Sequence, residues 1–429
     1  MRNSNSMSSM SKVYQFPNHW NWFVDQLIPT YVKKTYSPKE SWKSKPFSKE
    51  DAFFFYKGIE ELSELFTEER PSRLPTYFNH PKNRSAYLLY FLPLQAAKFY
   101  HLFETQTKAI DSLIQHGKKT GTIQVADLGA GPGTASIALL FYLLAHHSKS
   151  LESFPPIHFY WFDTCRTIML DGVNLIEEIE KEYPVLSGKI KITLEVEPWW
   201  KSTQKLPQEL SLILMGHLLN EAQVNIGPSK PKPTQASLEQ IDTEEVEKLE
   251  RPSLDPTWEK ILERSKGAGL LCIEPATRKN SHTLSQLRDR IFESQTLPES
   301  PSSIWGPCLH AGKCPLATGR DWCHFSEPLK IPGKWFKEFS KALAAEKEYI
   351  KFCYLWLASA DYPAPVLTKK NPDLRRVISD PLRGQKGQPS SVLLCEPEQP
   401  GRLILKPQEK IWRGEIINKP KTWYKVRNK

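Results

Sequence analysis

Three glycines at alternating positions form the motif with the clearest chemical meaning. The run is Asp127-Leu-Gly129-Ala-Gly131-Pro-Gly133, and it lies between a β-rich stretch (122–128) and an apolar helical stretch (134–146). Glycine suits a loop that turns sharply and brings its backbone close to a ligand, because no Cβ stands in the way. The run therefore predicts a cofactor loop between a strand and a helix. A dinucleotide loop of the G-x-G-x-x-G type and a purely structural turn are the alternatives.

The acid two residues before the first glycine resembles the first motif of S-adenosylmethionine-dependent methyltransferases. In that family the acid that ends the second strand holds the ribose hydroxyls. The resemblance implies this role for Asp163, which follows the strand pattern of residues 157–162. A carboxylate accepts two hydrogen bonds from a diol. Asp163 lies further beyond the glycines than is usual, since residues 148–156 add a loop, and a helix N-cap role explains it equally well.

The segment after the fourth predicted strand carries the reacting groups in many methyltransferases. Here His217, Asn220 and Glu221 are predicted on the first turns of a helix at the carboxyl edge of the sheet. We expect His217 and Asn220 to contact the cofactor. The alternative is that the three residues cap and solvate the helix. The chain has no Asn/Asp-Pro-Pro-aromatic motif and no Pro-Cys motif at this place. The sequence thus favours cofactor binding over turnover and assigns no catalytic residue.

Cysteines form the second constellation. Cys308, Cys314 and Cys323 lie close together in a Pro- and Gly-rich stretch, and Cys395 lies near the C-terminal end. Four thiolates suit tetrahedral zinc or an iron–sulfur cluster of the 4Fe–4S type. The C-x₂-C pairs of zinc ribbons are missing, and the wide spacing favours the cluster. His310 or His324 could replace one thiol in a zinc site, but we rather expect them to support the metal ligands or to face RNA. Cysteines without a metal are the third alternative.

A radical S-adenosylmethionine enzyme would combine cluster and cofactor in another way. That class needs a C-x₃-C-x₂-C run, which leaves one iron open, and the chain has no such run. The other three cysteines, Cys165, Cys272 and Cys353, lie in apolar or regular stretches and are predicted to be ordinary buried residues.

The elements that position these residues follow a strand–helix alternation. Residues 121–360 predict βαβ units and a parallel sheet, which is the α/β, Rossmann-like fold of class I S-adenosylmethionine-dependent methyltransferases. This domain would include an inserted loop at 225–255 and the Cys-rich loop at 305–326. Residues 1–120 predict a helical region, in which Pro93 kinks or splits one helix. Residues 361–429 predict a small β-containing module, joined to the rest by the metal.

Positive charge is concentrated at the C-terminal end. Of the 58 basic and 48 acidic residues, 20 and 10 lie in residues 331–429, so the first 330 residues are neutral. A basic module on a neutral body predicts a polyanion partner, most simply RNA. We expect Arg375, Arg376, Arg383 and Lys386 to face RNA phosphates. A solvated basic tail without a partner is the alternative.

Targeting signals are weak. No apolar run reaches the ~18 residues that a membrane span needs, and the first residues lack the apolar segment of a secretion signal. We therefore expect no membrane partner and a reducing compartment: the cytoplasm, or the mitochondrial matrix in a eukaryote. The Ser-rich, acid-free start has some transit-peptide character. We expect a monomer.

Taken together, glycine loop and cysteines resemble one family: the methyltransferase-like proteins of small-ribosomal-subunit assembly, known in bacteria and mitochondria. The similarity runs from Arg84-Ser-Ala-Tyr87 through the glycine loop, His217-Leu-Leu-Asn220-Glu221 and Ile273-Glu274-Pro275 to the cysteines and the segment 376–395. It implies a 4Fe–4S cluster on Cys308, Cys314, Cys323 and Cys395, and action on the small subunit and its rRNA. Both rRNA methylation and a non-catalytic assembly role are compatible with this resemblance.

Overall fold

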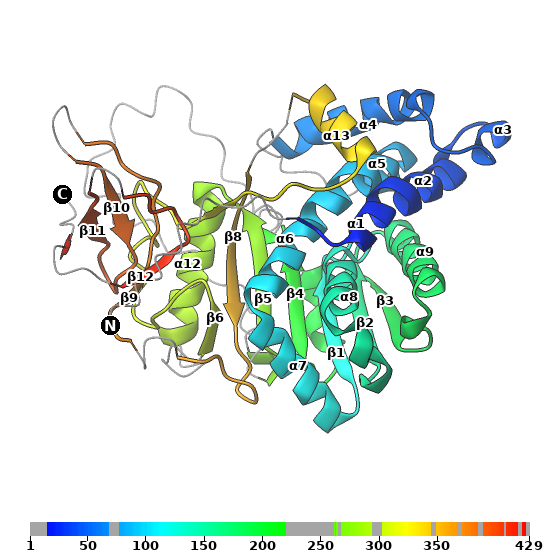
Figure 1. The fold of residues 1–429 in the computed structure, drawn as a ribbon. Helices are drawn as coiled ribbons and strands as arrows, with labels where there is room; N and C mark the ends of the chain where they lie inside the picture. Colours follow the sequence, from blue (N-terminus) through cyan, green and yellow to red (C-terminus); the bar gives the residue numbers. More distant parts are fainter. Residues whose placement is uncertain are drawn as a thin grey trace, which may run out of the picture.

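A mixed sheet forms the centre of the computed structural model (Figure 1). The structure describes residues 15–67, 77–219, 261, 263–264, 267–293, 303–344, 349–366, 371–384, 389–406, 409–418 and 423–425. In these residues the strands of the central sheet are β1 (Ile123–Leu128), β2 (Ile157–Asp163), β3 (Ile190–Val196), β4 (Leu212–Gly216), β5 (Leu270–Pro275), β6 (Ile304–Gly306), β7 (Phe325–Glu327) and β8 (Ile350–Leu357).

The strand order identifies the fold. The order is β3-β2-β1-β4-β5-β8-β6, with β7 also paired to β8. Strands β1 to β5 are parallel to one another, and β8 runs antiparallel to both β5 and β6. Five parallel strands with one antiparallel strand inserted before the edge are typical of class I S-adenosylmethionine-dependent methyltransferases. The predicted fold class is therefore confirmed.

Each strand contributes side chains to two hydrophobic clusters, one on each face of the sheet, because successive side chains point to opposite faces. In β1, Val125 belongs to the larger cluster, whereas Ala126 and Leu128 belong to the cluster on the other face. The helices that follow the first strands are α8 (Thr134–His147) and α9 (Arg166–Glu182), both on the first face. Helix α12 (Arg278–Glu293) contributes to the second. Helix α8 has buried residues on all of its sides, as expected for a helix between a sheet and a further layer.

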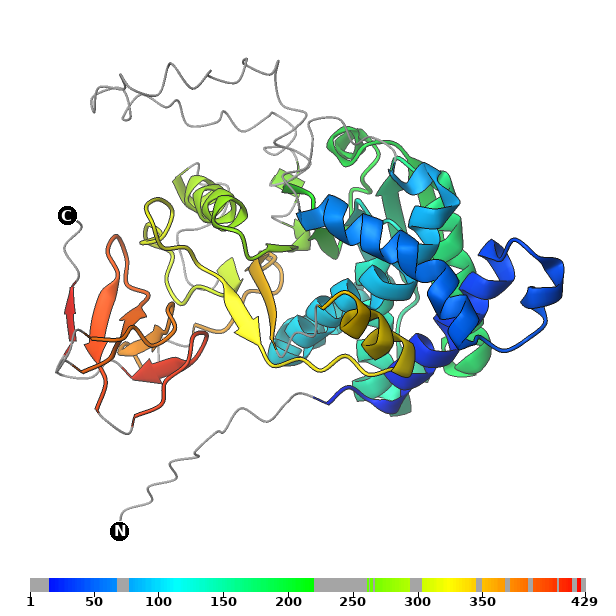
Figure 2. The same cartoon turned by 90° about the horizontal axis from the view of Figure 1, so that it is seen from above.

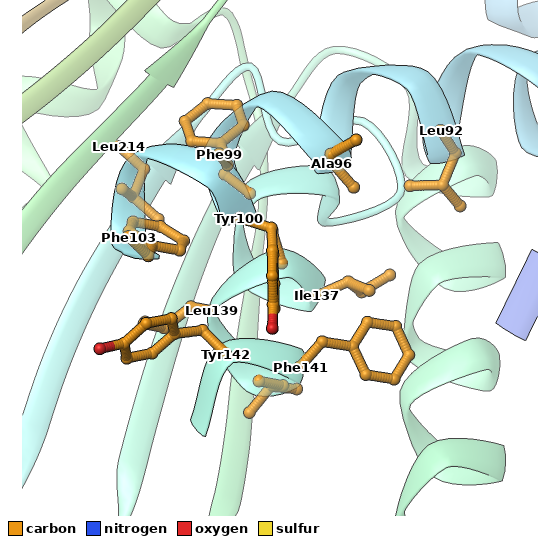
Figure 3. Packing of buried hydrophobic residues seen from close by; sticks show 14 of the residues in the cluster. Leu92, Ala96, Phe99, Tyr100, Phe103, Ile137, Leu139, Phe141, Tyr142 and Leu214 are labelled. Carbon is orange, nitrogen blue, oxygen red and sulfur yellow. The ribbon is translucent and has the colours of Figure 1, made fainter. Parts of the chain in front are cut away.

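That further layer is the helical N-terminal region. Its elements are α1 (Asn18–Trp22), a π-helix (Phe23–Leu27), α2 (Ile28–Tyr36), α3 (Glu40–Lys43), α4 (Lys49–Thr67), a 3-10 turn (Tyr77–Asn79), α5 (Pro81–Ala86), a π-helix (Tyr87–Phe91), α6 (Leu92–Thr105) and α7 (Thr107–Thr120). Figure 3 shows Phe99, Tyr100 and Phe103 of α6 against Phe141 and Tyr142 of α8. The helical region and the sheet thus share one core.

Pro93 splits its helix as predicted. The chain passes from α5 through one π-helical turn into α6, where proline occupies the first turn. Proline has no N–H to donate to the preceding turn, so a break in the regular hydrogen-bond pattern is expected there.

Helix α13 (Lys334–Ala342) lies in a part of the chain for which the sequence analysis predicted no element. Trp335, Phe336 and Phe339 are buried on its inner side. Its ring partners belong to the N-terminal region, with Trp335 against Phe47 and Phe336 against Tyr90. A nine-residue helix is too short to show a clear apolar period by itself.

The C-terminal module lies at the other end of the molecule from these helices (Figures 1 and 2). It contains β9 (Leu374–Arg376) paired with β12 (Ile416–Asn418), and a sheet of β10 (Ser391–Leu394), β11 (Gly401–Ile404) and β13 (Trp423–Lys425). Val377, Val392, Leu394 and Leu403 belong to its own small core. The β-containing character predicted for residues 361–429 is confirmed in the described residues.

The inserted loop predicted at 225–255 lies outside the described residues. Among the described helices, none is long and apolar enough to cross a lipid bilayer.

Candidate functional site

The glycine loop, residues 129–133, crosses the carboxyl end of β1 in a conformation that only glycine adopts easily. Gly129, Gly131 and Gly133 have φ values of +66°, +54° and +71°. A Cβ on Gly129 would lie 2.2 Å from a Leu218 methyl group, and one on Gly133 would lie 2.1 Å from the Trp161 ring. Two of the glycines are therefore required by packing as well as by backbone conformation.

Gly131 differs from the other two. The nearest atom to a Cβ placed on it is a Phe78 ring carbon at 3.8 Å, so one side of the loop is open there. Phe78 belongs to the 3-10 turn of the helical region, and its carbonyl accepts a hydrogen bond from Arg84 Nη1 at 2.7 Å. The helical region thus covers the loop at Gly131, which is buried but has room for a further atom beside its Cα.

Two acids hold the loop. Asp163 Oδ2 accepts the Gly131 N–H at 3.0 Å, and its Oδ1 accepts the Cys165 N–H at 2.9 Å. Asp127 is buried and accepts the backbone N–H (3.3 Å) and the hydroxyl (2.8 Å) of Ser136 on α8. Ser136 in turn accepts the Trp161 indole N–H at 2.9 Å. Asp127 therefore braces the start of α8, while Asp163 faces the loop.

Burial sets the electrostatics of Asp127. Desolvation raises the pKa of this carboxyl to about 7, the nearby Asp163 charge adds to the rise, and the two hydrogen bonds from Ser136 oppose it. Near neutral pH a large fraction of Asp127 is therefore protonated.

The segment after β4 departs from the prediction at one residue. His217 lies ahead of the helix, with a left-handed φ of +62°, and its N–H donates to the Ile273 carbonyl at 2.9 Å. The predicted position on the first helical turn is therefore wrong for His217. The backbone two residues further on is held by Glu274, which is fully buried at the end of β5. Its Oε1 accepts the Leu219 N–H at 2.9 Å. Asn220 and Glu221 lie outside the described residues.

A buried acid on α9 fastens the helical region beside the loop. Asp171 accepts the Tyr31 hydroxyl at 2.8 Å and the Tyr36 hydroxyl, and Arg84 Nε lies 3.8 Å from it. The next residue, Gly172, approaches so closely that a Cβ would lie 2.3 Å from the Pro132 carbonyl of the glycine loop. This network was missed because its members are far apart in sequence and form no motif.

The four predicted cysteines line one cavity. Cys308, Cys314, Cys323 and Cys395 share its wall with Ser281, Arg288 and a fifth thiol, Cys353 of β8. Cys314, Cys323 and Cys395 also pack against one apolar cluster of Leu316, Ile378 and Leu393. Cys395 is thus brought to the other three, although it lies in the C-terminal module. Among the described residues, no three His, Cys, Asp or Glu groups are arranged so as to hold one metal ion.

Helix α12 holds the cysteine loop from one side. Arg288 is 1% exposed, forms an ion pair with Asp289, and donates from Nη2 to the His310 carbonyl at 2.6 Å. Both Asp289 oxygens accept the Cys314 N–H at 3.0 Å. His310 Nε2 lies 3.2 Å from the Cys395 sulfur.

The C-terminal module closes the cavity from the other side. Cys395 N–H donates to the Arg376 carbonyl at 2.8 Å. Arg376 itself donates from Nε to the Pro307 carbonyl at 2.5 Å and from Nη1 to the Gly414 carbonyl at 2.7 Å. The Arg376 side chain therefore joins the module to the start of the cysteine loop, and its backbone carbonyl holds Cys395 within the module.

The thiols are kept neutral by their surroundings. Burial, reinforced by the electrostatic effect of the neighbouring Cys308, raises the pKa of Cys314 to about 11, and burial raises the pKa of Cys323 and Cys395 as well. Arg288 opposes the rise at Cys314 and Cys395, and Arg376 opposes it at Cys323. A bound cation would replace these protons, because only thiolates bind metals.

The basic residues predicted to face RNA occupy different environments. Arg375 Nε lies 2.8 Å from Glu396 Oε1, and Arg376 is engaged as described. Arg383 is exposed, and Lys386 lies outside the described residues. Much of the charge of Arg375 and Arg376 is thus used inside the protein, and contact with RNA stays a prediction for all four.

Comparison with known families gives one match. Residues 245–409 match the family model described as mitochondrial small ribosomal subunit Rsm22. The matched region contains the cysteine loop, α12, α13 and most of the C-terminal module. The resemblance inferred from the sequence is confirmed over these residues. None of the curated proteins matches the chain.

Solved structures with a similar fold include several methyltransferases. A provisionally assigned class I S-adenosylmethionine-dependent methyltransferase from Listeria monocytogenes has 12% identity, a TM-score of 0.35, and coverage of 81% of this chain and 91% of the other. A plantazolicin methyltransferase solved with SAH has 7% identity, a TM-score of 0.29, and coverage of 72% and 98%. A conserved hypothetical protein of Streptococcus pyogenes has 12% identity, a TM-score of 0.24, and coverage of 56% and 88%. The fold assignment rests on the strand order, since these scores are low.

Replacing Asp127 by Asn should change how stability depends on pH. The folded-state pKa of Asp127 lies above its value of about 4 in the unfolded chain, so the folded protein binds the proton more tightly. This contribution to stability is present at low pH and is lost as pH rises toward about 7. Asn cannot ionise, and D127N should therefore gain stability relative to wild type between pH 5 and pH 8, by about 1 kcal/mol or more.

Urea unfolding at the two pH values measures this difference. Asp373→Asn, at an exposed position, is the matched control and should behave as wild type at both. If the advantage of D127N stayed constant or shrank as pH rose, the proposed cost of ionising Asp127 would be wrong.

Proposed function

We propose that this protein is an S-adenosylmethionine-binding maturation factor that acts on rRNA of the small ribosomal subunit, with an iron–sulfur cluster in the thiol cavity. The observation that carries the ribosomal assignment is the family match over residues 245–409. The fold and glycine loop support the cofactor, and the four thiols at one cavity support the cluster. Under this proposal the protein would work in the cytoplasm or the mitochondrial matrix.

The charges at the glycine loop favour S-adenosylmethionine over a dinucleotide. A pyrophosphate is usually bound by the N–H groups at the start of the helix. Here Asp127 already accepts the Ser136 N–H, and Asp163 accepts the Gly131 N–H, so the loop presents acids where a dinucleotide needs donors. A sulfonium cofactor carries positive charge and a ribose diol. Asp163 would receive the diol with its remaining lone pairs, and Gly131 would give the cofactor access to the backbone.

The thiol cavity suits an anionic, thiolate-bound metal centre. A four-thiolate 4Fe–4S or zinc centre carries net negative charge, and Arg288, Arg376 and Arg413 act electrostatically on the thiols that line the cavity. Cys308, Cys314, Cys323 and Cys395 would hold the group. The loop between the first three contains neither helix nor strand, so the free energy of metal binding would help to order it. Zinc is the alternative occupant.

The same centre would present a basic surface to RNA. Cys395 and β9 belong to one module, so fixing Cys395 also fixes the exposed Arg383 at a constant orientation. Phosphate contacts of this kind give affinity that depends strongly on salt and little on sequence.

Catalytic rRNA methylation is the second candidate, favoured by the intact glycine loop. Methyl transfer from a sulfonium needs chiefly in-line positioning and a dry site, so the lack of a titrating group after β4 is compatible with it. Incubating the protein with labelled S-adenosylmethionine and small-subunit precursors separates the two candidates. Label on rRNA supports the enzyme, and no label on any precursor eliminates it.

Substituting Gly131 by Ala should abolish S-adenosylmethionine binding. The added methyl group would occupy the open side of the loop, where we propose the cofactor lies. Gly188→Ala is the control, because Gly188 also has a positive φ (+71°) but a methyl group added there would have nothing within 4 Å. Both variants carry the same backbone cost of about 1 kcal/mol. Calorimetry should show cofactor binding for G188A and at least tenfold weaker binding for G131A; equal binding would refute the assignment.

The purified protein should be brown and should contain about four irons per chain when prepared without oxygen. Cys395→Ala should lose the colour and the iron. Cys353→Ala should keep both, because this fifth thiol lies within β8 and donates to the Pro275 carbonyl at 3.4 Å. The measurement is the number of iron and zinc atoms per chain in the two variants. A colourless protein with one zinc per chain would contradict the iron–sulfur cluster and support zinc as the occupant of the cavity.

Loss of the metal centre should weaken binding to small-subunit rRNA. Cys308→Ser should lower the affinity severalfold by releasing the C-terminal module, and Arg383→Ala should lower the salt slope by about 1. Lys191→Ala, an exposed cation on β3, is the control and should bind as wild type. Filter binding over a range of salt concentrations tests both. Wild-type affinity of the Cys308→Ser protein would disprove the coupling.

A further inference from the structure

A groove on the helical N-terminal region belongs to neither site described above. It lies between α3, the first half of α4 and the start of α5, and its volume is about 1140 Å³. This volume exceeds the usual upper limit of roughly 1,000 Å³ for small-molecule sites, so a segment of a polymer fits the groove better than one small ligand. Six of its described lining residues are aromatic: Tyr36, Trp42, Phe53, Phe54, Phe55 and Tyr56.

Two of these rings are unusually open to solvent. Phe53 is 83% exposed and Phe54 is 45% exposed. Phe54 is held edge to face between two neighbours, with its ring centroid 5.9 Å from that of Trp42 and 5.0 Å from that of the buried Phe55. Phe53 has no ring partner among the described residues. Single exposed apolar side chains are common, but adjacent aromatic rings in one groove are typical of a binding surface.

Lysines surround these rings. Residues 33–49 contain six lysines and one acid, although the first 330 residues as a whole are neutral. Lys33 is buried against Asp51, and Lys43 pairs with Glu40. Four exposed lysines of the segment form no ion pair with any described residue: Lys34, Lys39, Lys45 and Lys49. The segment therefore has a local excess of positive charge that attracts a polyanion.

Cations and rings alternate along the groove. Lys49, Phe53 and Lys57 are four residues apart on α4, so they lie on one face of the helix. Lys57 is exposed and, like Lys49, has no ion pair in the part of the chain that the structure describes. The Nζ atom of Lys39 lies 5.3 Å from the centre of the Trp42 ring. Rings interleaved with free ammonium groups are suited to bases joined by phosphates.

The acids of the groove are fewer than these free cations. They are Glu50 and Glu60, and Glu60 accepts the Tyr56 hydroxyl at 3.4 Å. A further lining cation, Lys82, is neutralised by Glu61 at 2.5 Å. The three unpaired lysines nearest the rings thus outnumber the two acids, and the balance favours an anionic occupant.

The groove shares a wall with the network beside the glycine loop. Tyr36 lines the groove and donates its hydroxyl to Asp171. The next residue, Gly172, packs against the Pro132 carbonyl of the glycine loop. A polymer bound in the groove would therefore lie on the same helices that cover the proposed cofactor site.

We propose that this groove binds a single-stranded segment of RNA. Bases would stack on Phe53 and Phe54, and phosphates would lie beside Lys39, Lys49 and Lys57. Stacking on protein rings requires bases that are not already stacked in a duplex, so loops and unpaired stretches are the fitting partners. This inference rests on the proposed rRNA function and deepens it, because it adds a contact at the end of the molecule away from the C-terminal module (Figures 1 and 2).

An oligouridylate of about 12 nucleotides is the probe, because it is single-stranded and matches the usual length of such sites. Fluorescence anisotropy with the full chain should show about tenfold weaker binding for Phe53→Ala. Phe53→Leu should be equally weak, since it keeps apolar bulk but loses the flat ring, whereas Phe53→Trp should bind as wild type. Tyr349→Ala removes another exposed ring, outside the groove, and is the matched control.

Salt dependence tests the phosphate contacts. Replacing Lys49 and Lys57 together by Gln should lower the salt slope by about 1.4, because each phosphate on a single strand contributes about 0.7. The double variant Lys118→Gln, Lys119→Gln loses the same charge from the last turn of α7 and should keep the wild-type slope. An equal loss of slope in both double variants would show that only net charge matters, and the groove would be rejected.

Cross-linking locates the strand. After irradiation of the full chain with an oligouridylate that contains 5-iodouridine, mass spectrometry should find adducts on peptides within residues 42–57. Adducts confined to residues 361–429, or wild-type affinity of both Phe53→Ala and Phe53→Leu, would overturn the groove as an RNA site and favour a protein partner there. The proposed function fails separately, since it is lost only if the wild-type chain does not bind small-subunit rRNA at all.

Discussion

The thiol cavity depends on a pair of buried charges. The loop that carries Cys308, Cys314 and Cys323 has no regular structure of its own, and Arg288 and Asp289 of α12 set its path. A buried guanidinium costs several kcal/mol unless its donors are matched. The Asp289 carboxylate and the His310 carbonyl accept from Nη1 and Nη2 of Arg288, and the same carboxylate orders the backbone at Cys314. One helix turn thus determines where the loop can bring its sulfur atoms.

Two neighbouring strands connect this cavity to the glycine loop. Strand β5 ends at Glu274, which holds the turn after β4 beside the cofactor loop, and its partner β8 carries Cys353 into the cavity wall. Glu274 and Cys353 are paired across the sheet. Both strands are largely buried, so the two sites are built on one pair of neighbouring strands.

The sequence predicted most of the regular structure but little of the polar network. Alternation and glycine chemistry located β1 to β5 and the loop, since these signals are local. Cys395 was assigned from the family resemblance, and the cavity agrees with it. His217 was misplaced because a left-handed backbone leaves no mark in residue type. Asp171 with its tyrosines was missed, because it gains its meaning only from residues distant in the chain.

The order in which the cavity walls emerge during synthesis has its own consequence. Segment 308–323 leaves the ribosome long before Cys395, and the contacts that close the cavity join parts far apart along the chain. Such contacts form slowly because the intervening loop must first be closed. Three thiols of a nascent molecule are therefore exposed to oxidants for the interval in which the module is still being made. Chaperone protection or a strongly reducing surrounding at that stage would decide how much of the protein matures correctly.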